Sequence, residues 1–246
     1  MSLDVDSLER LIPEYVQSGD STGQETLDLH IARYEFAAQQ AKPGRLLDIA
    51  CGAGYGTKLL CDRLSPNVII TGVDISEDAV KYAQGNYGDS RIKFKVSNAM
   101  NFSDSEGFDT IVSLETIEHL PDPRGFVAHL VTLLEPGGIL IGSVPTTPSV
   151  DANPHHLHDF TLATFQELFH VHQLVEVGRF EQCQPFNPFA LLTKREVRAK
   201  DIRPNLPKYY LQHPDALFRR IASTLCHGFT NQYITVAWQK SLRIKI

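Results

Sequence analysis

The feature that most constrains the fold is a regular alternation of short apolar segments with segments of helical periodicity, beginning after residue 44. Residues 68–70 and 139–141 are continuously hydrophobic, as expected of strands that helices cover on both faces. Alternation of this kind predicts βαβ units around a parallel sheet, which is the α/β class. The expected strands are 45–50, 68–74, 92–96, 109–113 and 139–144, and the expected helices between them are 55–64, 77–87 and 124–134.

Both ends of the chain depart from this alternation. Residues 3–40 have mainly helical periodicity with a break at 19–23, which predicts an N-terminal helical cover. Beyond the core, we expect a helix at 162–169 and strands at 174–180 and 233–238, with an insertion before the last strand that contains short helices at 190–200 and 216–226. The 246 residues amount to roughly 1.6 domains, so we expect one domain with appendages.

The formal net charge of −6 argues against a general binder of nucleic acids or anionic membranes, provided that the charge is evenly distributed. It is not evenly distributed. Residues 194–220 hold eight basic and three acidic side chains, a local balance of +5 that leaves −11 for the rest of the chain. This basic segment is either a solvated helical surface or a basic cap that faces an anionic group of the substrate.

Several absences indicate the compartment. The four cysteines form no C-x-x-C pair, the chain has no apolar run of 18 residues, and its first six residues are not typical of a signal peptide. We therefore expect a soluble protein of the cytoplasm.

A glycine-rich loop follows the first expected strand. It reads Gly52-Ala53-Gly54-Tyr55-Gly56, a G-x-G-x-G pattern, whereas a dinucleotide loop has its third glycine one position later. Asp48 precedes the loop by four residues and suits a cationic ligand better than a pyrophosphate. Asp74 closes the next strand, where α/β sheets present a carboxylate to ribose hydroxyls. Asn98 follows the third strand and supplies an amide for an adenine edge.

Over residues 45–144, and more weakly to 180, the chain resembles the class I S-adenosylmethionine-dependent methyltransferases. The resemblance implies a Rossmann-like, seven-stranded, mostly parallel sheet with an antiparallel last strand. It also implies one methyltransferase domain over 1–246, with a helical cover (1–41), a cofactor-binding core (45–180), a substrate-side insertion (181–228) and a last strand with its tail (229–246). The S-adenosylmethionine contacts that it implies are Arg33 at the carboxylate, Asp48 at the amino group, Gly52 and Gly54 at the methionine part, Asp74 at the ribose, Ile75, Asn98 and Ala99 at the adenine, and also Ala50 and Leu114.

A cluster of acidic residues and histidine follows the fourth strand, in Glu115-Thr116-Ile117-Glu118-His119. If this segment is a helical turn, Glu115, Glu118 and His119 lie within one arc of about 100°. Adjacent carboxylates repel, and a cation between them reverses the sign of that interaction. The alternative is a solvated turn before Pro121.

A second cluster has three of the ten histidines in four positions, in His155-His156-Leu157-His158. Such density is typical of metal binding or proton transfer. It is equally compatible with a histidine that caps the helix expected to begin near Thr161.

The two clusters together resemble two groups of O-methyltransferases, those of ubiquinone biosynthesis and those of small-RNA 3′ ends. In the second group a divalent cation is bound by Glu, Glu, His and a later His, whose motif matches here from His156. The resemblance implies that Glu115, Glu118, His119 and His156 bind one divalent cation, Mg²⁺, Mn²⁺ or Zn²⁺. His119, His155 and His158 are the candidates for the base that removes the proton from the hydroxyl.

We therefore expect an O-methyltransferase that uses S-adenosylmethionine and a divalent cation on a small diol-bearing acceptor, a sugar or glycoconjugate, which is anionic if the basic cap faces it. One alternative is a metal-independent enzyme for an aromatic or lipid-linked acceptor, with a histidine as base. Another is an RNA 3′-terminal 2′-O-methyltransferase, which the net negative charge disfavours. The last is a binding module without turnover. The sequence leaves the acceptor and the oligomeric state open.

Overall fold

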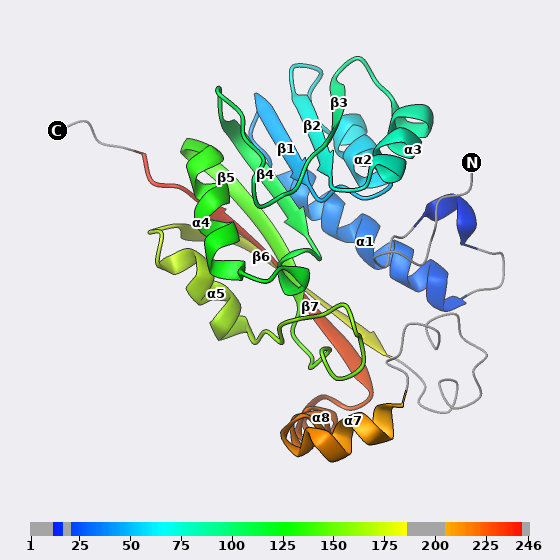
Figure 1. Ribbon diagram of the computed structural model, residues 1–246. Coiled ribbons are helices and arrows are strands. Elements are labelled where there is room, and N and C mark those ends of the chain that lie inside the picture. Colours follow the sequence, from blue (N-terminus) through cyan, green and yellow to red (C-terminus); the bar gives the residue numbers. More distant parts are fainter. Residues whose placement is uncertain (1–11, 17–20, 186–204, 243–246) are drawn as a thin grey trace.

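A seven-stranded sheet forms the centre of the computed structural model, which describes residues 12–16, 21–185 and 205–242 (Figure 1). The strands lie in the order β3-β2-β1-β4-β5-β7-β6. They are β1 Arg45–Ile49, β2 Ile69–Asp74, β3 Ile92–Val96, β4 Phe108–Leu114, β5 Leu134–Pro145, β6 Val175–Pro185 and β7 Thr230–Gln239. Pairing is parallel from β3 to β5 and antiparallel where β7 meets β5 and β6. The predicted Rossmann-like fold, including the antiparallel last strand, is confirmed.

Helices cover both faces of the sheet. The α-helices are α1 Ser21–Gln40, α2 Tyr55–Arg63, α3 Glu77–Tyr87, α4 Pro123–Leu133, α5 Leu162–His170, α7 Leu206–Gln212 and α8 Pro214–His227, and short 3-10 helices are η1 Pro13–Tyr15 and η2 Ile117–His119. One buried cluster joins α4 and α5 to the sheet, with Phe126, Phe165 and Trp238 at its centre. The other joins α1, α2 and α3 to the opposite face. Figure 1 shows these two groups of helices on either side of the strands.

The core strands and helices lie close to their expected positions because their periodicities are local. Strands β4, β5, β6 and β7 are all longer than predicted. β5 begins at Leu134, which pairs with Phe108, and the register shift there accommodates Gly137 at φ 79°. β6 extends to Pro185, into the segment expected to be insertion, because it pairs antiparallel with β7 along its whole length.

The insertion is partly described. α8 includes the helix expected at 216–226, whereas α7 was not predicted. Its first turn contains Pro207. Proline usually indicates a loop in a sequence, but it is well tolerated in the first turn of a helix. The helix expected at 190–200 and the N-terminal residues 3–11 lie outside the described residues. Both α7 and α8 lie beyond the carboxyl end of the parallel strands (Figure 1).

Within the described part of the chain, no helix combines the length and the apolar character needed to cross a bilayer.

Candidate active site

The glycine loop connects the carboxyl end of β1 to α2. Ala50, Gly52 and Gly54 all have positive φ, at 62°, 56° and 86°. A Cβ on Gly54 would lie 2.5 Å from the Cβ of Ala83, so this glycine is required for packing. A Cβ on Gly52 would have no atom within 4 Å. Gly52 therefore leaves open space beside the backbone, where a ligand can approach.

Asp48 lies beneath this loop and is buried, with 1% of its surface exposed. Its carboxylate accepts hydrogen bonds from Thr57 Oγ1 at 2.6 Å and from the Tyr34 hydroxyl at 3.4 Å. Burial raises the pKa of Asp48 to about 7, with a smaller contribution from the charge of Asp74, although both hydrogen bonds oppose the shift. A cationic ligand would stabilise the ionised form of this buried carboxylate, because the positive charge compensates for the hydration that the carboxylate has lost.

Asp74 holds the loop from the end of β2. One carboxylate oxygen accepts the Gly52 N–H at 2.9 Å and the other accepts the Ser76 N–H at 2.9 Å, at the start of α3. The next residue, Ile75, is 58% exposed, which is unusual for a large aliphatic side chain beside a site. The end of β3 is adjacent, because Ser97 N–H donates to the Asp74 carbonyl at 2.9 Å.

The other predicted cofactor residues occupy the same edge of the sheet. Asn98 is exposed and its side-chain oxygen accepts the Met100 N–H at 2.9 Å. Ala99 and Leu114 are half-buried and pack against the two core clusters. An open backbone at Gly52, a buried carboxylate and an exposed aliphatic side chain together fit a ligand that has a cationic amino group and a flat base.

Glu115 does not lie where a helical turn would place it. Its φ is 46°, and η2 begins only at Ile117, so the expected single turn from 115 to 119 is wrong. Its carboxylate accepts a hydrogen bond from Ser143 Oγ at 2.7 Å and lies 3.7 Å from a terminal nitrogen of Arg33. The Glu115 side chain thus contacts Arg33 of α1 and Ser143 of β5.

Arg33 is a buried cation at the junction of α1, β4, β6 and β7. It is 1% exposed, its Nε donates to Gln182 Oε1 at 2.7 Å, and its guanidinium lies 4.4 Å from the centre of the Tyr233 ring. One of its terminal nitrogens, the one near Glu115, makes no hydrogen bond within the described residues. This nitrogen is therefore available to a further acceptor.

Glu118, His119 and His156 form a compact trio. One ligand atom from each lies within 4.8 Å of the others, and Glu118 is 1% exposed. His119 Nε2 is 4.0 Å from a Glu118 carboxylate oxygen, and the two imidazole centres are 4.7 Å apart. Ligands on opposite sides of one ion are about 4.2 Å apart when each bond is about 2.1 Å. Small side-chain rotations would therefore bring all three to a single cation.

The trio is held together by backbone contacts between η2 and the loop 146–161, called here the His loop. Leu157 N–H donates to the Glu118 carbonyl at 2.8 Å. His119 Nδ1 is 3.1 Å from the His155 carbonyl, which only accepts, so this nitrogen carries the proton. His156 Nδ1 is 2.7 Å from Ser149 Oγ. Such contacts orient imidazole rings in many metal sites.

The remaining histidines of the His loop have other contacts. His158 Nε2 donates to the Leu120 carbonyl at 2.9 Å, and this bond fixes the loop against the end of η2. His155 is exposed and offers its backbone carbonyl to His119. Of the residues predicted for the metal and the base, the structure therefore brings together Glu118, His119 and His156, but not Glu115.

An ion pair between a buried aspartate and a half-buried arginine of α8 could not be predicted from the sequence. Asp151 in the His loop is 2% exposed and accepts from Arg220 Nε of α8 at 2.9 Å, and the Tyr210 hydroxyl of α7 binds it too. The only sequence signal was the basic segment that contains Arg220. The position of Asp151 in a loop does not by itself indicate which basic residue pairs with it.

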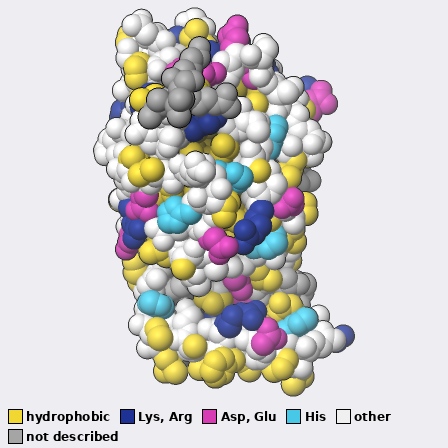
Figure 2. Space-filling model, turned by 90° about the vertical axis from the view of Figure 1, so that its left-hand side faces the viewer, with side chains coloured by type: hydrophobic (Ala, Val, Ile, Leu, Met, Phe, Trp, Pro, Cys, Tyr) yellow, Lys and Arg dark blue, Asp and Glu magenta, His cyan; other side chains and the backbone are white. Residues whose placement is uncertain are grey.

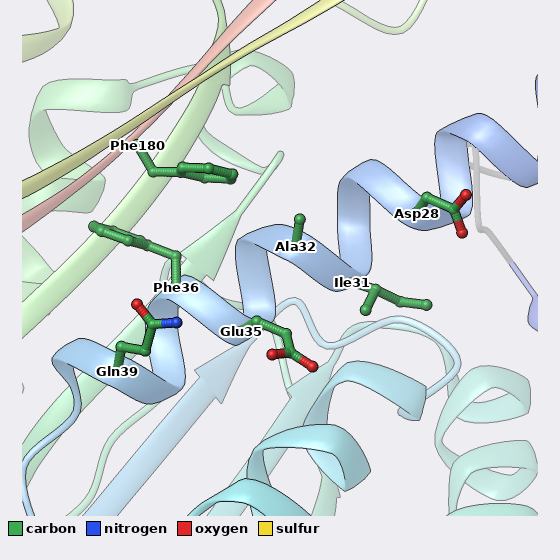
Figure 3. A pocket seen from close by; sticks show the side chains of 7 residues that line it. All are labelled: Asp28, Ile31, Ala32, Glu35, Phe36, Gln39 and Phe180. Carbon is green, nitrogen blue, oxygen red and sulfur yellow. The ribbon is translucent and has the colours of Figure 1, made fainter.

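Two surface hollows lie outside the trio, one of them against the His loop. One, of about 410 Å³, follows the outer side of α1, where the rings of Phe36 and Phe180 stack 5.7 Å apart (Figure 3). None of the predicted site residues lines it. The other, of about 670 Å³, lies between α4, α5 and the His loop and includes His158 and Asp159.

Comparison with known proteins agrees with this geometry. A family model described as a methyltransferase domain matches residues 47–142, from β1 through the glycine loop and η2 to β5. This region is thus similar to the methyltransferase domains of S-adenosylmethionine-dependent enzymes. The methyltransferase domain therefore contains nearly all the predicted cofactor residues, with Arg33 just before it.

Two curated relatives match part of the chain. The malonyl-[acyl-carrier protein] O-methyltransferase of Acetivibrio thermocellus is 34% identical over 95 residues, which are 39% of this chain and 33% of that protein. The ubiquinone biosynthesis O-methyltransferase of Xanthomonas campestris pv. campestris is 31% identical over 122 residues, which are 47% of this chain and 50% of that protein. The chain thus spans a third to about half the length of these relatives.

The fold extends further than the sequence similarity. The N-methyltransferase NodS of Bradyrhizobium japonicum WM9, solved in complex with S-adenosyl-L-homocysteine, superimposes with a TM-score of 0.59 over 92% of this chain and 91% of that one, at 18% identity. At this identity the similarity concerns the fold of the methyltransferase and not its acceptor.

Proposed function

We propose that the chain transfers a methyl group from S-adenosylmethionine to a hydroxyl of a small diol-bearing acceptor, a sugar or glycoconjugate, with the help of a divalent cation. The observation that carries this proposal is the convergence of Glu118, His119 and His156 within 4.8 Å, next to the carboxyl end of β4. An O-methyltransferase among the relatives supports oxygen as the accepting atom.

The cofactor would be held by residues that already fit it. Asp48 would bind the amino group, Asp74 the ribose hydroxyls, and Ile75 the adenine face, while Gly52 leaves room for the methionine part. The bound sulfonium supplies an activated methyl group. The task left to the chain is to position the acceptor oxygen in line with that group and to exclude water.

Arg33 is suited to the carboxylate of the cofactor. Its guanidinium is buried, and one terminal nitrogen has Glu115 at 3.7 Å and no hydrogen bond within the described residues. A second carboxylate can share such a cation with little further desolvation, because the guanidinium has already lost its hydration. The position of Arg33 on α1 would then close the helical cover over the methionine end.

The trio would bind the cation. One carboxylate and two imidazoles suit Mg²⁺, Mn²⁺ or Zn²⁺. A cation held there lowers the pKa of a coordinated hydroxyl. Glu115, which the sequence indicates as a fourth ligand, would have to leave Ser143 and Arg33 to take part.

The proton of the hydroxyl needs an acceptor. His155 is the better placed of the two remaining candidates, because it is exposed beside His156, whereas the ring of His158 is engaged by the Leu120 carbonyl. His119 would serve as the base if no cation is bound.

A second candidate function follows from the same trio. His119 Nε2 lies 4.0 Å from the Glu118 carboxylate. A nearby carboxylate stabilises the positive charge of an imidazole that has accepted a proton. This pair supports a metal-independent enzyme for an aromatic or lipid-linked acceptor. The RNA alternative depends on the basic segment 194–220, of which residues 194–204 lie outside the described residues.

The test combines binding and turnover. Purified chain and its Glu118→Gln and His156→Ala variants are titrated with Mn²⁺ by calorimetry, and methylation of sugars and phenols is assayed with and without a chelator. We expect Mn²⁺ binding and chelator-sensitive methylation of a diol in the unmodified chain only. Full activity in chelator would reject the cation and favour the second candidate. Binding of S-adenosyl-L-homocysteine without any methylation would favour a binding module.

A further inference from the structure

Arg33 of α1 differs from the basic side chains of the protein surface. Figure 2 shows several Lys and Arg side chains on one face of the molecule that are exposed and have Asp or Glu side chains beside them. Arg33 is 1% exposed, and Glu115 lies 3.7 Å from a terminal nitrogen that makes no hydrogen bond within the described residues. A buried guanidinium depends on the polar groups around it, so these groups decide where its remaining donors lie.

Two of the contacts of Arg33 come from one cross-strand pair. Gln182 of β6 lies directly opposite Tyr233 of β7 in the antiparallel register, and directly opposite side chains lie on the same face of a sheet. The Arg33 Nε–H donates to Gln182 Oε1 at 2.7 Å. The central guanidinium carbon lies 4.4 Å from the centre of the Tyr233 ring, as in a cation–π contact. We call Gln182 and Tyr233 the guanidinium clamp.

Both members of the clamp are themselves held in place. Gln182 Nε2 donates to the Leu29 carbonyl at 3.1 Å, one helical turn before Arg33 on α1. Because the amide nitrogen is engaged there, the amide oxygen faces Arg33 and the amide has one orientation. The Tyr233 hydroxyl donates to Gln184 Oε1 at 3.3 Å, and Gln184 is 1% exposed. The clamp therefore has a fixed geometry.

The clamp opposes the attraction between Arg33 and Glu115. The nitrogen and the carboxylate oxygen are 3.7 Å apart, which is beyond hydrogen-bond distance although the charges are opposite and Arg33 is buried. The bond at Nε and the stacked ring fix the plane of the guanidinium at this distance. The terminal nitrogen thus keeps its donors for a further acceptor.

We propose that Gln182 and Tyr233 are positioning residues, which act through Arg33 to make the cofactor site select a ligand that has a carboxylate. This inference rests on the proposed function, in which Arg33 binds the carboxylate of S-adenosylmethionine. A side chain that is already ordered loses less rotamer freedom when its ligand binds, which corresponds to about three- to tenfold in affinity. The family model ends at residue 142, so both clamp residues belong to a part of the chain that it does not match.

The test compares two ligands by calorimetry on the full chain. One is S-adenosyl-L-homocysteine, and the other is its decarboxylated analogue, which keeps the base, ribose, sulfide and amino group. We expect the unmodified chain to prefer S-adenosyl-L-homocysteine at least about tenfold, because charge-assisted contacts are strong. Gln182→Met keeps the length of the side chain but removes both hydrogen bonds. It should reduce this preference about three- to tenfold and leave the affinity for the analogue unchanged.

Other variants separate positioning from general stability. Tyr233→Leu should reduce the preference as Gln182→Met does, whereas Tyr233→Phe keeps the ring and should preserve the preference. The matched control is Gln166→Met, which breaks the bond from Gln166 of α5 to Glu176 at 2.7 Å. Because α5 packs on the opposite face of the sheet from α1, this control should also preserve the preference.

The outcomes distinguish this inference from the proposed function. An equal loss of affinity for both ligands in Gln182→Met would overturn the inference, because a merely structural residue acts in that way. Arg33→Met should abolish the preference. If it does so while Gln182→Met and Tyr233→Leu retain the preference, Arg33 binds the carboxylate and the clamp does not position it. If Arg33→Met retains the preference, the role of Arg33 in the proposed function fails together with the inference.

Discussion

Arg220 of α8 binds Asp151 of the His loop, with Nε 2.9 Å from a carboxylate oxygen that is almost wholly buried. The two residues are 69 positions apart in the chain. This pair attaches α8 to the loop that carries His156, and so links α8 to the trio.

The first prediction concerns this pair. Arg220→Ala leaves the Asp151 carboxylate buried without its cation, so we expect a loss of about 2–4 kcal/mol in the free energy of unfolding. Urea denaturation measures it. The neighbouring Arg219→Ala removes an exposed pair with Asp215 and should cost less than about 1 kcal/mol. Equal losses of unfolding free energy in the two variants would mean that Arg220 does not stabilise the buried carboxylate of Asp151.

The second prediction concerns the pH dependence of cofactor binding. Asp48 has a pKa of about 7, and its ionised form suits the ammonium group of the cofactor. Affinity for S-adenosyl-L-homocysteine should therefore increase as the pH rises through about 7, measured by calorimetry. Asp48→Asn should bind more weakly and lose this pH dependence. A similar pH profile in the variant would assign the titration to another group.

The third prediction concerns stability without cofactor. The pKa of Asp48 is raised from its ordinary value of 3.8 to about 7 by folding, because burial disfavours the charge. Its contribution to stability is thus fully present below pH 4 and is lost as the pH rises through about 7, amounting to a few kcal/mol. Asp48→Asn should therefore become more stable relative to the unmodified protein between pH 4 and pH 8. A stability difference that stays constant with pH would contradict the raised pKa.

The fourth prediction separates two glycines of one loop. Gly54→Ala places a Cβ against Ala83 and should cost about 1–3 kcal/mol in stability or more. Gly52→Ala meets open space, so it should cost only about 1 kcal/mol for its positive φ. It should nevertheless weaken S-adenosyl-L-homocysteine binding about tenfold, or about 1.4 kcal/mol. Thermal melts and calorimetry test both, and unchanged affinity in Gly52→Ala would exclude a ligand at that position.

The fifth prediction compares two glutamates. Glu118→Gln should lower Mn²⁺ affinity at least about tenfold, because Glu118 belongs to the trio. Glu115→Gln should change it little, because Glu115 is directed to Ser143 and Arg33. A larger loss of Mn²⁺ affinity in Glu115→Gln than in Glu118→Gln would show that the Glu115 carboxylate turns to the cation when the cation binds.

Much of the site could be predicted because its residues follow strand ends. Asp48, Asp74 and Asn98 come at fixed points of βα units, and adjacent parallel strands bring such points to one edge of the sheet. The resemblance to O-methyltransferases added Glu115, Glu118, His119 and His156, and the structure brings together the last three. The prediction that places Glu115 with them holds only if 115–119 is a helical turn, whereas the chain has a positive φ at Glu115 and η2 begins at Ile117.

The sequence by itself determined the alternation of strands and helices, the glycine loop and the types of side chain at the strand ends, because these depend on residues near one another in the chain. Tertiary structure decided the length of β6 through its pairing with β7, the direction of Glu115 through Arg33 and Ser143, and the attachment of α8 through Asp151. Each of these depends on partners far apart in sequence, and no local periodicity encodes which partners will meet.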